Sequence, residues 1–167
     1  MHRSMRRANR EITDADELLG IIEACDVVRV GAVDEEGLVI VPMSFGFDWK
    51  ASGEEGRPRL TVWLHSAREG RKADAWSADP RVAIELDCPD GVITGDYACS
   101  YSLAYRSIMG SGRISQVKDA AEKLHGLARI MEHAAPGSPT DFSPEAVEHV
   151  AVWRIDVERL TGKSRRA

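Results

Sequence analysis

Short segments in which apolar and polar residues alternate recur along this chain, and they limit its fold more than any other feature. The alternation favours β-strands with one buried face, because successive side chains of a strand point to opposite sides of a sheet. Turn formers or helical patterns separate the segments, and strands and helices do not alternate regularly. We therefore predict a mainly β, α+β fold, in which a six-stranded antiparallel sheet closes into a small barrel with helices outside. The six predicted strands are 27–33, a long second strand through 43–49, 60–65, 82–86, 102–114 and 153–157.

Helical spacing of apolar residues predicts the helices between these strands. A first helix is expected to be capped by Thr13 and to end near Ala24. A second helix is expected to end before Pro80, because the residue before a proline avoids the α region. The clearest amphipathic helix is predicted to begin with Ser115 as its N-cap. A short helical turn is expected after the loop at 135–144.

Length and composition indicate one globular domain. With 167 residues, 43% of them apolar and 29% charged, the chain can bury one continuous core. We expect a single domain over 1–167, with a flexible basic leader at 1–10 and a flexible tail at 162–167. No apolar run is long enough to cross a bilayer, and no apolar segment follows the basic leader as it does in a signal peptide. The sequence therefore predicts no membrane partner and a cytoplasmic location.

Charge and cysteine usage exclude further classes. A net charge of −5 argues against nucleic-acid binding through a general basic surface, so any anion bound here is expected to be small. Cys25, Cys88 and Cys99 are odd in number and widely spaced, and no C-x-x-C pair is present. This pattern predicts small buried thiols in a reducing compartment rather than disulfides or a zinc site. The histidines form no ligand motif, and we expect no metal centre.

The stretch HSAREGRK, residues 65–72, carries the strongest functional signal. It runs from the end of a predicted strand into a predicted helix and places Arg71 and Lys72 in the first turn. The first turn of a helix already carries the positive end of the macrodipole, so two cations there need negative charge nearby. With His65, Ser66 and the free backbone amides, they provide the donors that a phosphate group requires.

A simpler explanation of these two cations stays open at this point. Arg71 and Lys72 could extend into solvent, with Glu69 and Asp74 screening them. The unfavourable interaction with the helix dipole would then cost only about 0.3–1 kcal/mol. His65 is equally ambiguous from its position alone, because a histidine at the end of a strand is commonly structural.

Four stretches together resemble a known family. The order PMSFGF, VWLHSAREGRKADAWSADPRVAIELD, YRSIMGSGRI and VWRIDVERLTGK is similar to that of the FMN-binding split β-barrel superfamily, which includes the pyridoxamine 5′-phosphate oxidases. The most similar branch is that of the 5-nitroimidazole-resistance (Nim-type) flavoproteins. The resemblance covers residues 6 to 163, and its most specific part is H-S at 65–66, G-R-K at 70–72 and D-P-R-V at 79–82.

The resemblance implies a split barrel that forms a homodimer with two FMN molecules between the subunits. Arg71 and Lys72 would bind the FMN phosphate. Tyr105 would approach the flavin across the dimer interface, and Trp153 is a weaker candidate for the same role. The dimer would also bury aromatic side chains of the barrel, namely Phe45, Phe47 and Trp49. The other implied flavin-contacting residues are Val41, Pro42, Met43, Ser44, Leu64, His65 and Ser66.

The implied activity is FMN-dependent oxidation and reduction. A reduced nicotinamide or another small donor would supply electrons, a small oxidised molecule such as a nitroaromatic would accept them, and His65 would be the catalytic side chain. The chain ends in LTGKSRRA and lacks the arginine-rich R-L-x-P segment of the pyridoxamine 5′-phosphate oxidases, which argues against that particular activity. Related split barrels bind F420 or haem, so an F420-dependent reductase and a non-catalytic flavin or haem carrier or sensor are the alternatives.

Overall fold

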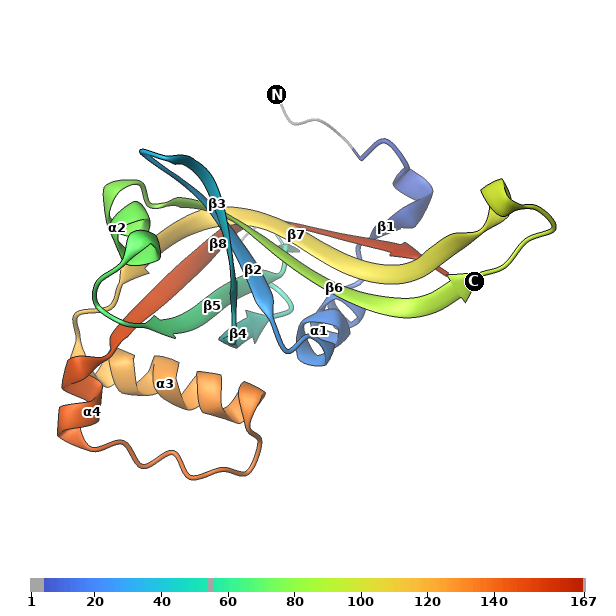
Figure 1. The fold of residues 1–167 in the computed structure, drawn as a ribbon. Coiled ribbons are helices and arrows are strands. Elements are labelled where there is room, and N and C mark those ends of the chain that lie inside the picture. The colour runs from blue at the N-terminus through green and yellow to red at the C-terminus, as the bar shows by residue number, and fades with distance from the viewer. Residues whose placement is uncertain (1–4, 54–55, 167) are drawn as a thin grey trace.

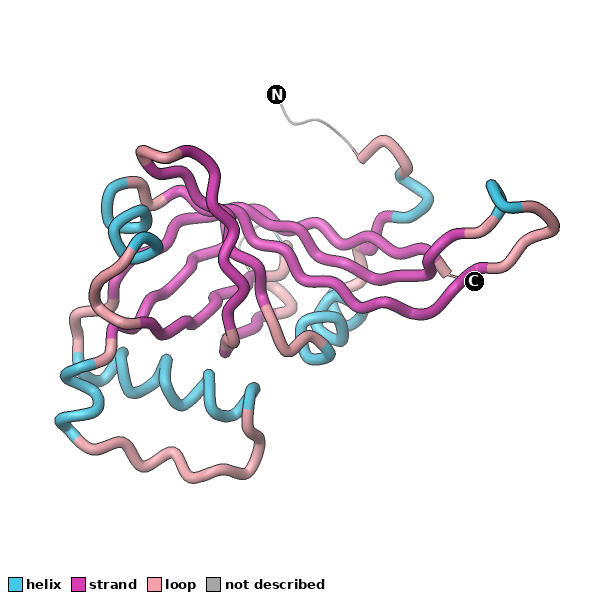
Figure 2. Tube along the Cα trace, viewed as in Figure 1, coloured by secondary structure: helices cyan, strands magenta, loops and turns pink. Residues whose placement is uncertain are grey.

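The computed structural model describes residues 5–53 and 56–166 and consists mainly of β-structure. Its elements, in chain order, are η1 (Ala8–Arg10), β1 (Glu11–Ile12), α1 (Ala15–Ala24), β2 (Val28–Asp34), β3 (Gly37–Met43), β4 (Gly46–Lys50), β5 (Arg59–Ser66), α2 (Arg71–Ala78), β6 (Arg81–Ile93), η3 (Ala98–Ser100), β7 (Ser102–Gln116), α3 (Ala120–Ala134), α4 (Pro144–His149) and β8 (Ala151–Arg165). Figure 2 shows that strands make up the body of the molecule and that helices lie at its periphery.

The strands form one antiparallel sheet with the order β3-β2-β6-β7-β8-β5-β4, and β1 pairs with β8 outside this path (Figure 1). The two strands at the ends of this path, β3 and β4, follow each other directly in the chain. Only Ser44 and Phe45 separate them, so the two edges of the sheet are held close together and the sheet closes on itself. The predicted fold class, a mainly β split barrel with flanking helices, is confirmed.

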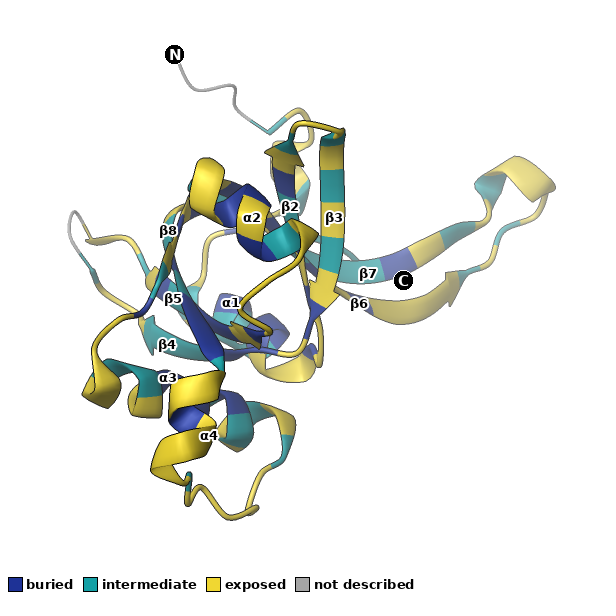
Figure 3. Ribbon diagram, turned by 60° about the vertical axis from the view of Figure 1, so that its left-hand side comes forward, coloured by how far each residue is buried: buried dark blue, intermediate teal, exposed yellow. Residues whose placement is uncertain are grey.

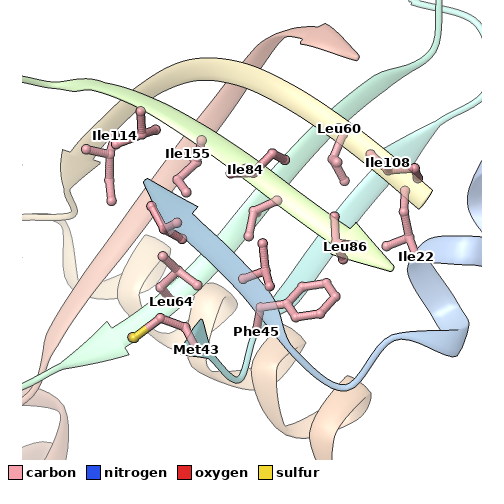
Figure 4. Close-up of a cluster of buried hydrophobic side chains, with 14 of the residues drawn as sticks. Ile22, Met43, Phe45, Leu60, Leu64, Ile84, Leu86, Ile108, Ile114 and Ile155 are labelled. Atoms are coloured by element: carbon pink, nitrogen blue, oxygen red, sulfur yellow. The ribbon is translucent and has the colours of Figure 1, made fainter. Parts of the chain in front are cut away.

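The core lies inside this closed sheet, because alternate residues of each strand point inward. Figure 4 shows branched aliphatic side chains from β5, β6, β7 and β8 meeting there, together with Phe45 and with Ile22 of α1. A second, smaller apolar cluster lies under α3 and α4, where Trp63, Leu127 and Ile130 are buried. The sheet thus carries α1 and α3 on separate apolar surfaces.

The aromatic side chains just before and on β4 are buried to different degrees within one chain. Phe45 is fully buried in the core of this chain, and Phe47 and Trp49 are half-buried against the same core. Phe45 and Phe47 also contact the imidazole of His133, at ring-centroid distances of 4.5 and 5.2 Å. Phe45 therefore needs no dimer for its burial, and that a dimer covers the exposed parts of Phe47 and Trp49 stays a prediction.

Over the described residues the sheet contains eight strands rather than the six predicted, and the difference arises at two places. The predicted long strand through 43–49 breaks at Ser44, because the chain changes partner there from β2 to β5. A glycine follows the break, and a Cβ at Gly46 would lie 2.2 Å from the backbone carbon of Arg129. The short β1 also was not predicted, because two residues show no periodicity.

Three predicted boundaries are wrong for reasons of strand pairing and capping. Ser115 does not cap α3, because β7 continues to Gln116 alongside β8 and the side chain of Asp119 caps the helix instead. Likewise, Asp14 rather than Thr13 caps α1. The tail from residue 162 to 165, expected to be flexible, forms the end of β8 and pairs with β7 and β1. Of the leader, residues 8–10 form η1, and residues 1–4 lie outside the described part of the chain.

Candidate functional site

The start of α2 is built by a glycine turn after β5. β5 ends at Ser66, and four residues later Gly70 takes a φ of 117°, a conformation that L side chains rarely adopt. Gly70 has no side chain with which to cap the helix, and no side-chain cap is found among the described residues. The first backbone N–H groups of α2 are therefore available to an anion.

Arg71 forms ion pairs with two carboxylates of the β2–β3 turn. Its Nε lies 2.5 Å from Oδ2 of Asp34, and its Nη2 donates to Oδ1 of the same carboxylate at 3.1 Å. Its Nη1 is 3.1 Å from Oε2 of Glu36. Figure 3 shows α2 beside this hairpin. The side chain of Arg71 is still 47% exposed, but the carboxylates that pair with it are Asp34 and Glu36 rather than Glu69 and Asp74, which the simpler explanation expected.

This ion pair shifts the pKa of both partners in the expected directions. The hydrogen bonds from Arg71 hold the pKa of Asp34 below its ordinary value of 3.8. In turn, the carboxylate of Asp34 raises the pKa of Arg71. Asp34 is therefore ionised at neutral pH and Arg71 is charged throughout the physiological range.

Lys72 is placed differently, because it forms no ion pair with any described residue. Its Nζ lies 3.6 Å from the thioether sulfur of Met43, a weak acceptor, which joins the start of α2 to the end of β3. Its side chain also lines a cavity of about 480 Å³. An ammonium group held at a cavity without a carboxylate partner is suited to an anionic ligand.

The same cavity brings His65 and Ser66 next to Lys72. His65 is exposed at the end of β5, while Ser66 is buried beneath it. The hydroxyl of Ser66 donates to the carbonyl of Ala67 at 2.6 Å and accepts from Nε1 of Trp153 at 2.9 Å. Ser66 thus has no proton left for a ligand, and its hydroxyl positions the loop that leads to α2.

Part of the cavity wall comes from α4, and no local sequence pattern predicts a site there. Ala146, His149 and Val150 line this wall, so two imidazoles, those of His65 and His149, face one cavity. Nδ1 of His149 is 2.8 Å from the carbonyl oxygen of Glu145. Sequence reasoning also misses Asp34 and Glu36 as site residues, because no local pattern connects their turn to the start of α2.

The other residues predicted to contact the flavin differ in how far their side chains are exposed. On β3, Val41 is half-buried, Pro42 is exposed and Met43 is buried against Lys72, while Ser44 is exposed just beyond the strand. Leu64 is fully buried in the core, so only its backbone can reach a ligand.

Two predicted residues lie away from the cavity beside Lys72. Trp153 is buried, with its ring against Trp76 at a centroid distance of 5.2 Å, and supports the loop rather than lining the cavity. Tyr105 lines a different cavity of about 450 Å³, on the extended β6–β7 hairpin with Pro89 and Leu103. Within one chain, the structure therefore does not bring Tyr105 to His65 and Lys72.

The described residues contain neither a cluster suited to a metal ion nor a helix suited to cross a membrane. No group of three or more histidine, cysteine, aspartate or glutamate side chains is arranged there to hold a metal ion. Among the same residues, no helix combines the length and the apolar character that a membrane crossing demands.

A family comparison assigns the chain to a class of proteins. Residues 14–164 match the pyridoxamine 5′-phosphate oxidase family, which comprises split barrels that bind flavins. The chain belongs to this family. The search of curated proteins found no match.

Solved structures with the same fold agree with this assignment. One is a protein from Bacteroides thetaiotaomicron that is provisionally assigned to 5-nitroimidazole antibiotic resistance. It is 32% identical to this chain, and the match covers 92% of this chain and 86% of that one, with a TM-score of 0.76. The flavocytochrome Anf3 from Azotobacter vinelandii is 20% identical over 99% and 73% of the two chains, with a TM-score of 0.78. The FAD- and haem-binding protein from Mycobacterium smegmatis is 16% identical over 95% and 74%, with a TM-score of 0.78. The last two show the fold alone.

We expect Asp34→Asn to lower stability at neutral pH but not in acid. The folded-state pKa of Asp34 lies below its ordinary value of 3.8, so its pairing with Arg71 stabilises the fold above that pH and is lost as the pH falls through the folded-state pKa. Urea unfolding of wild type and variant from pH 7 to pH 2 measures this difference. The asparagine keeps an oxygen that accepts the backbone N–H of Glu36, so the change removes mainly the charge.

Glu35→Gln is the matched control, because Glu35 is an exposed carboxylate of the same turn for which no ion pair is observed. A stability difference for Asp34→Asn that is independent of pH, or equal to that of the control, would contradict the assigned role of the ion pair.

Proposed function

We propose that this chain is an FMN-binding oxidoreductase that transfers electrons to a small oxidised acceptor, with nitroaromatics as the first class to test. The observation that carries the proposal is the start of α2, where uncapped backbone amides, Lys72 and Arg71 converge beside the cavity that His65 lines. Membership of a flavin-binding family and 32% identity to a protein assigned to nitroimidazole resistance support it.

The donors at this site fit the FMN phosphate, with Lys72 as the principal anchor. The ammonium of Lys72 has no carboxylate to give up when an anion binds, whereas Arg71 is shared with Asp34 and Glu36. A guanidinium has five N–H donors, so Arg71 can keep Asp34 and still donate to a phosphate oxygen. The two carboxylates limit the net positive charge and favour one small anion over a polyanion.

Bound FMN would supply the hydride and electron transfer, and the chain's own residues would hold and protonate the reactants. His65 is exposed at the cavity beside Lys72, where a ring nitrogen can donate a proton to the reduced acceptor. Ser66 and Trp153 hold the end of β5 in place through their hydrogen bond. The exposed backbone around Pro42 and Ser44 would lie along the ring system.

We further propose that the functional unit is a homodimer. Leu38 and Ile40 on the outer face of β3 are 86% and 70% exposed, and Met109 on β7 is 62% exposed. In the row of Ile40 the outward residues of the next strands are small, since Gly31 pairs with Ile40 and Ala83 pairs with Gly31. Met109 instead pairs with Glu85, which forms an ion pair with Arg29, so the face is apolar around Leu38 and Ile40 and charged beside Met109. This face suits a second copy of the chain, with the apolar part at its centre. The second copy would also give Tyr105 a route to the flavin that one chain does not provide.

A haem-binding carrier or sensor is the alternative function, and one observation favours it. His65 and His149 line the same cavity, and neutral imidazoles are common haem ligands. The absorption spectrum of the purified protein separates the two proposals. A flavin spectrum at one FMN per chain supports the first, and a Soret band without flavin supports the second.

We expect Lys72→Gln to weaken FMN binding by about 10- to 100-fold, the amount that corresponds to losing one charged hydrogen bond. Fluorescence titration of the apoprotein with FMN measures the dissociation constant. Arg68→Gln is the matched control, because Arg68 is exposed in the same loop and no ion pair of it is observed. Equal dissociation constants for the Lys72→Gln and Arg68→Gln proteins would refute Lys72 as the phosphate anchor.

His65→Ala should reduce the turnover number by about 100-fold or more, as removal of a proton donor does. FMN affinity should change much less, because the phosphate is held elsewhere. Steady-state reduction of a nitroimidazole by NADPH gives the turnover number, and the FMN titration gives the affinity. A variant that loses FMN binding but keeps its turnover when saturated would exclude a catalytic role for His65.

Ile40→Asp should convert the dimer to a monomer, because it places a charge in the apolar face. Light scattering should find twice the chain mass of 18.4 kDa for wild type and the single mass for the variant. Leu124→Asp, on the exposed side of α3, controls for the loss of one apolar surface residue. A wild-type monomer, or a variant that stays dimeric, would disprove this interface.

A further inference from the structure

The fold pairs two thiols that the sequence separates by 63 positions. The Sγ atoms of Cys25 and Cys88 lie 3.1 Å apart, and the residues are only 3% and 8% exposed. Cys25 is the C-cap residue of α1, and Cys88 lies on β6. Both are free and buried, as predicted, and they meet because α1 packs against β6, whereas Cys99, also predicted to be buried, is exposed.

We propose that Cys25 and Cys88 form a redox site, in which a small hydroperoxide oxidises them to an intramolecular disulfide. A disulfide bond is about 2.05 Å long, so the sulfur atoms need to approach by about 1 Å. Both positions lie next to a break in regular backbone pairing. Cys25 lies at the junction between α1 and β2, and the register of β6 with β7 shifts just after Cys88, between Pro89 and Val92.

A cavity gives a small oxidant access to the pair. It measures about 430 Å³ and is lined by both cysteines and by charged side chains from four segments. Asp87 and Asp90 are paired there with Arg29 and Arg106. Asp26 lines the same cavity and forms no ion pair with the described residues. A small neutral peroxide enters such a charged site more easily than a large anionic disulfide does.

The thiol chemistry balances with one peroxide molecule. The Cys88 thiolate, from the more exposed of the two residues, attacks one oxygen of the peroxide, which breaks the O–O bond and leaves a sulfenic acid on Cys88. The hydroxide released takes up the proton that Cys88 lost and becomes water. The sulfur of Cys25 then attacks the sulfenic sulfur, and the Cys25 proton leaves with the hydroxyl group as a second water. Two thiols thus lose two electrons, and the peroxide is reduced to two waters.

The environment of Cys25 disfavours it as the first thiol to react, which leaves it the resolving role. Burial, together with the hydrogen bond to Cys88, raises the pKa of Cys25 to about 12, so this residue is a thiol at neutral pH and is not the sulfur that first attacks the peroxide. The disulfide would tie the end of α1 to the root of the extended β6–β7 hairpin. Its formation should raise the melting temperature of the protein, because it cross-links distant parts of the unfolded chain.

The test uses the folded Cys99→Ser protein, which removes the exposed thiol and leaves the pair intact. The protein is treated with hydrogen peroxide, denatured, alkylated and weighed by mass spectrometry. We expect a loss of about 2 Da, no alkylation and a linked peptide that contains Cys25 and Cys88, all reversed by dithiothreitol. Two alkylated thiols after peroxide treatment, under conditions that oxidise the urea-unfolded protein, would overturn the proposal.

A second variant separates disulfide formation from ordinary oxidation. In the Cys25→Ala, Cys99→Ser protein, Cys88 has no resolving thiol, so peroxide should add oxygen atoms to Cys88 instead of removing hydrogens. If the Cys99→Ser protein shows the same oxygen addition and no linked peptide, the two sulfurs do not act as a pair. Neither result depends on flavin binding, so failure here leaves the proposed function unaffected.

Discussion

The positive amino-terminal end of α2 requires negative charge, and the site is arranged around that requirement. Two cations in the first turn add to the helix dipole, yet each is accommodated in its own way. Arg71 is held by the carboxylates of Asp34 and Glu36, which come from a distant turn. Lys72 keeps its charge beside a cavity, against a thioether and without a carboxylate. The structure therefore assigns one cation to holding the fold and leaves the other available to a ligand.

The side chains of the site are positioned by hydrogen-bonded strands of the barrel rather than by long loops. β5 carries His65 to the cavity, the β2–β3 hairpin carries Asp34 to α2, and β3 ends at Met43 beside Lys72. Because β3 and β4 are consecutive and form the two edges of the sheet, the site lies where the sheet closes. A site built on rigid strands keeps its geometry before any ligand binds, which reduces the ordering that binding must pay for.

The sequence predicted the parts of this structure that local pattern controls. Strand alternation and helix breakers gave the fold class, and the cations of α2 gave the candidate site. Long-range partners could not be predicted, since nothing local connects Arg71 to Asp34 or Cys25 to Cys88. Ser115 shows a similar limit, because its preference for a helix cap lost to the pairing of β7 with β8. The conformational preference of a single residue such as Ser115 is overridden where pairing with a neighbouring strand supplies backbone hydrogen bonds.

The most direct test of the central claim compares the affinity of the apoprotein for FMN with its affinity for riboflavin, which lacks the phosphate. If the start of α2 is an anion site, FMN should bind at least about 100-fold more tightly than riboflavin, and most of that ratio should disappear in high salt. Equal affinities for the two flavins at low salt would contradict the account, because they would mean that the phosphate contributes nothing and that Lys72 and Arg71 serve another purpose.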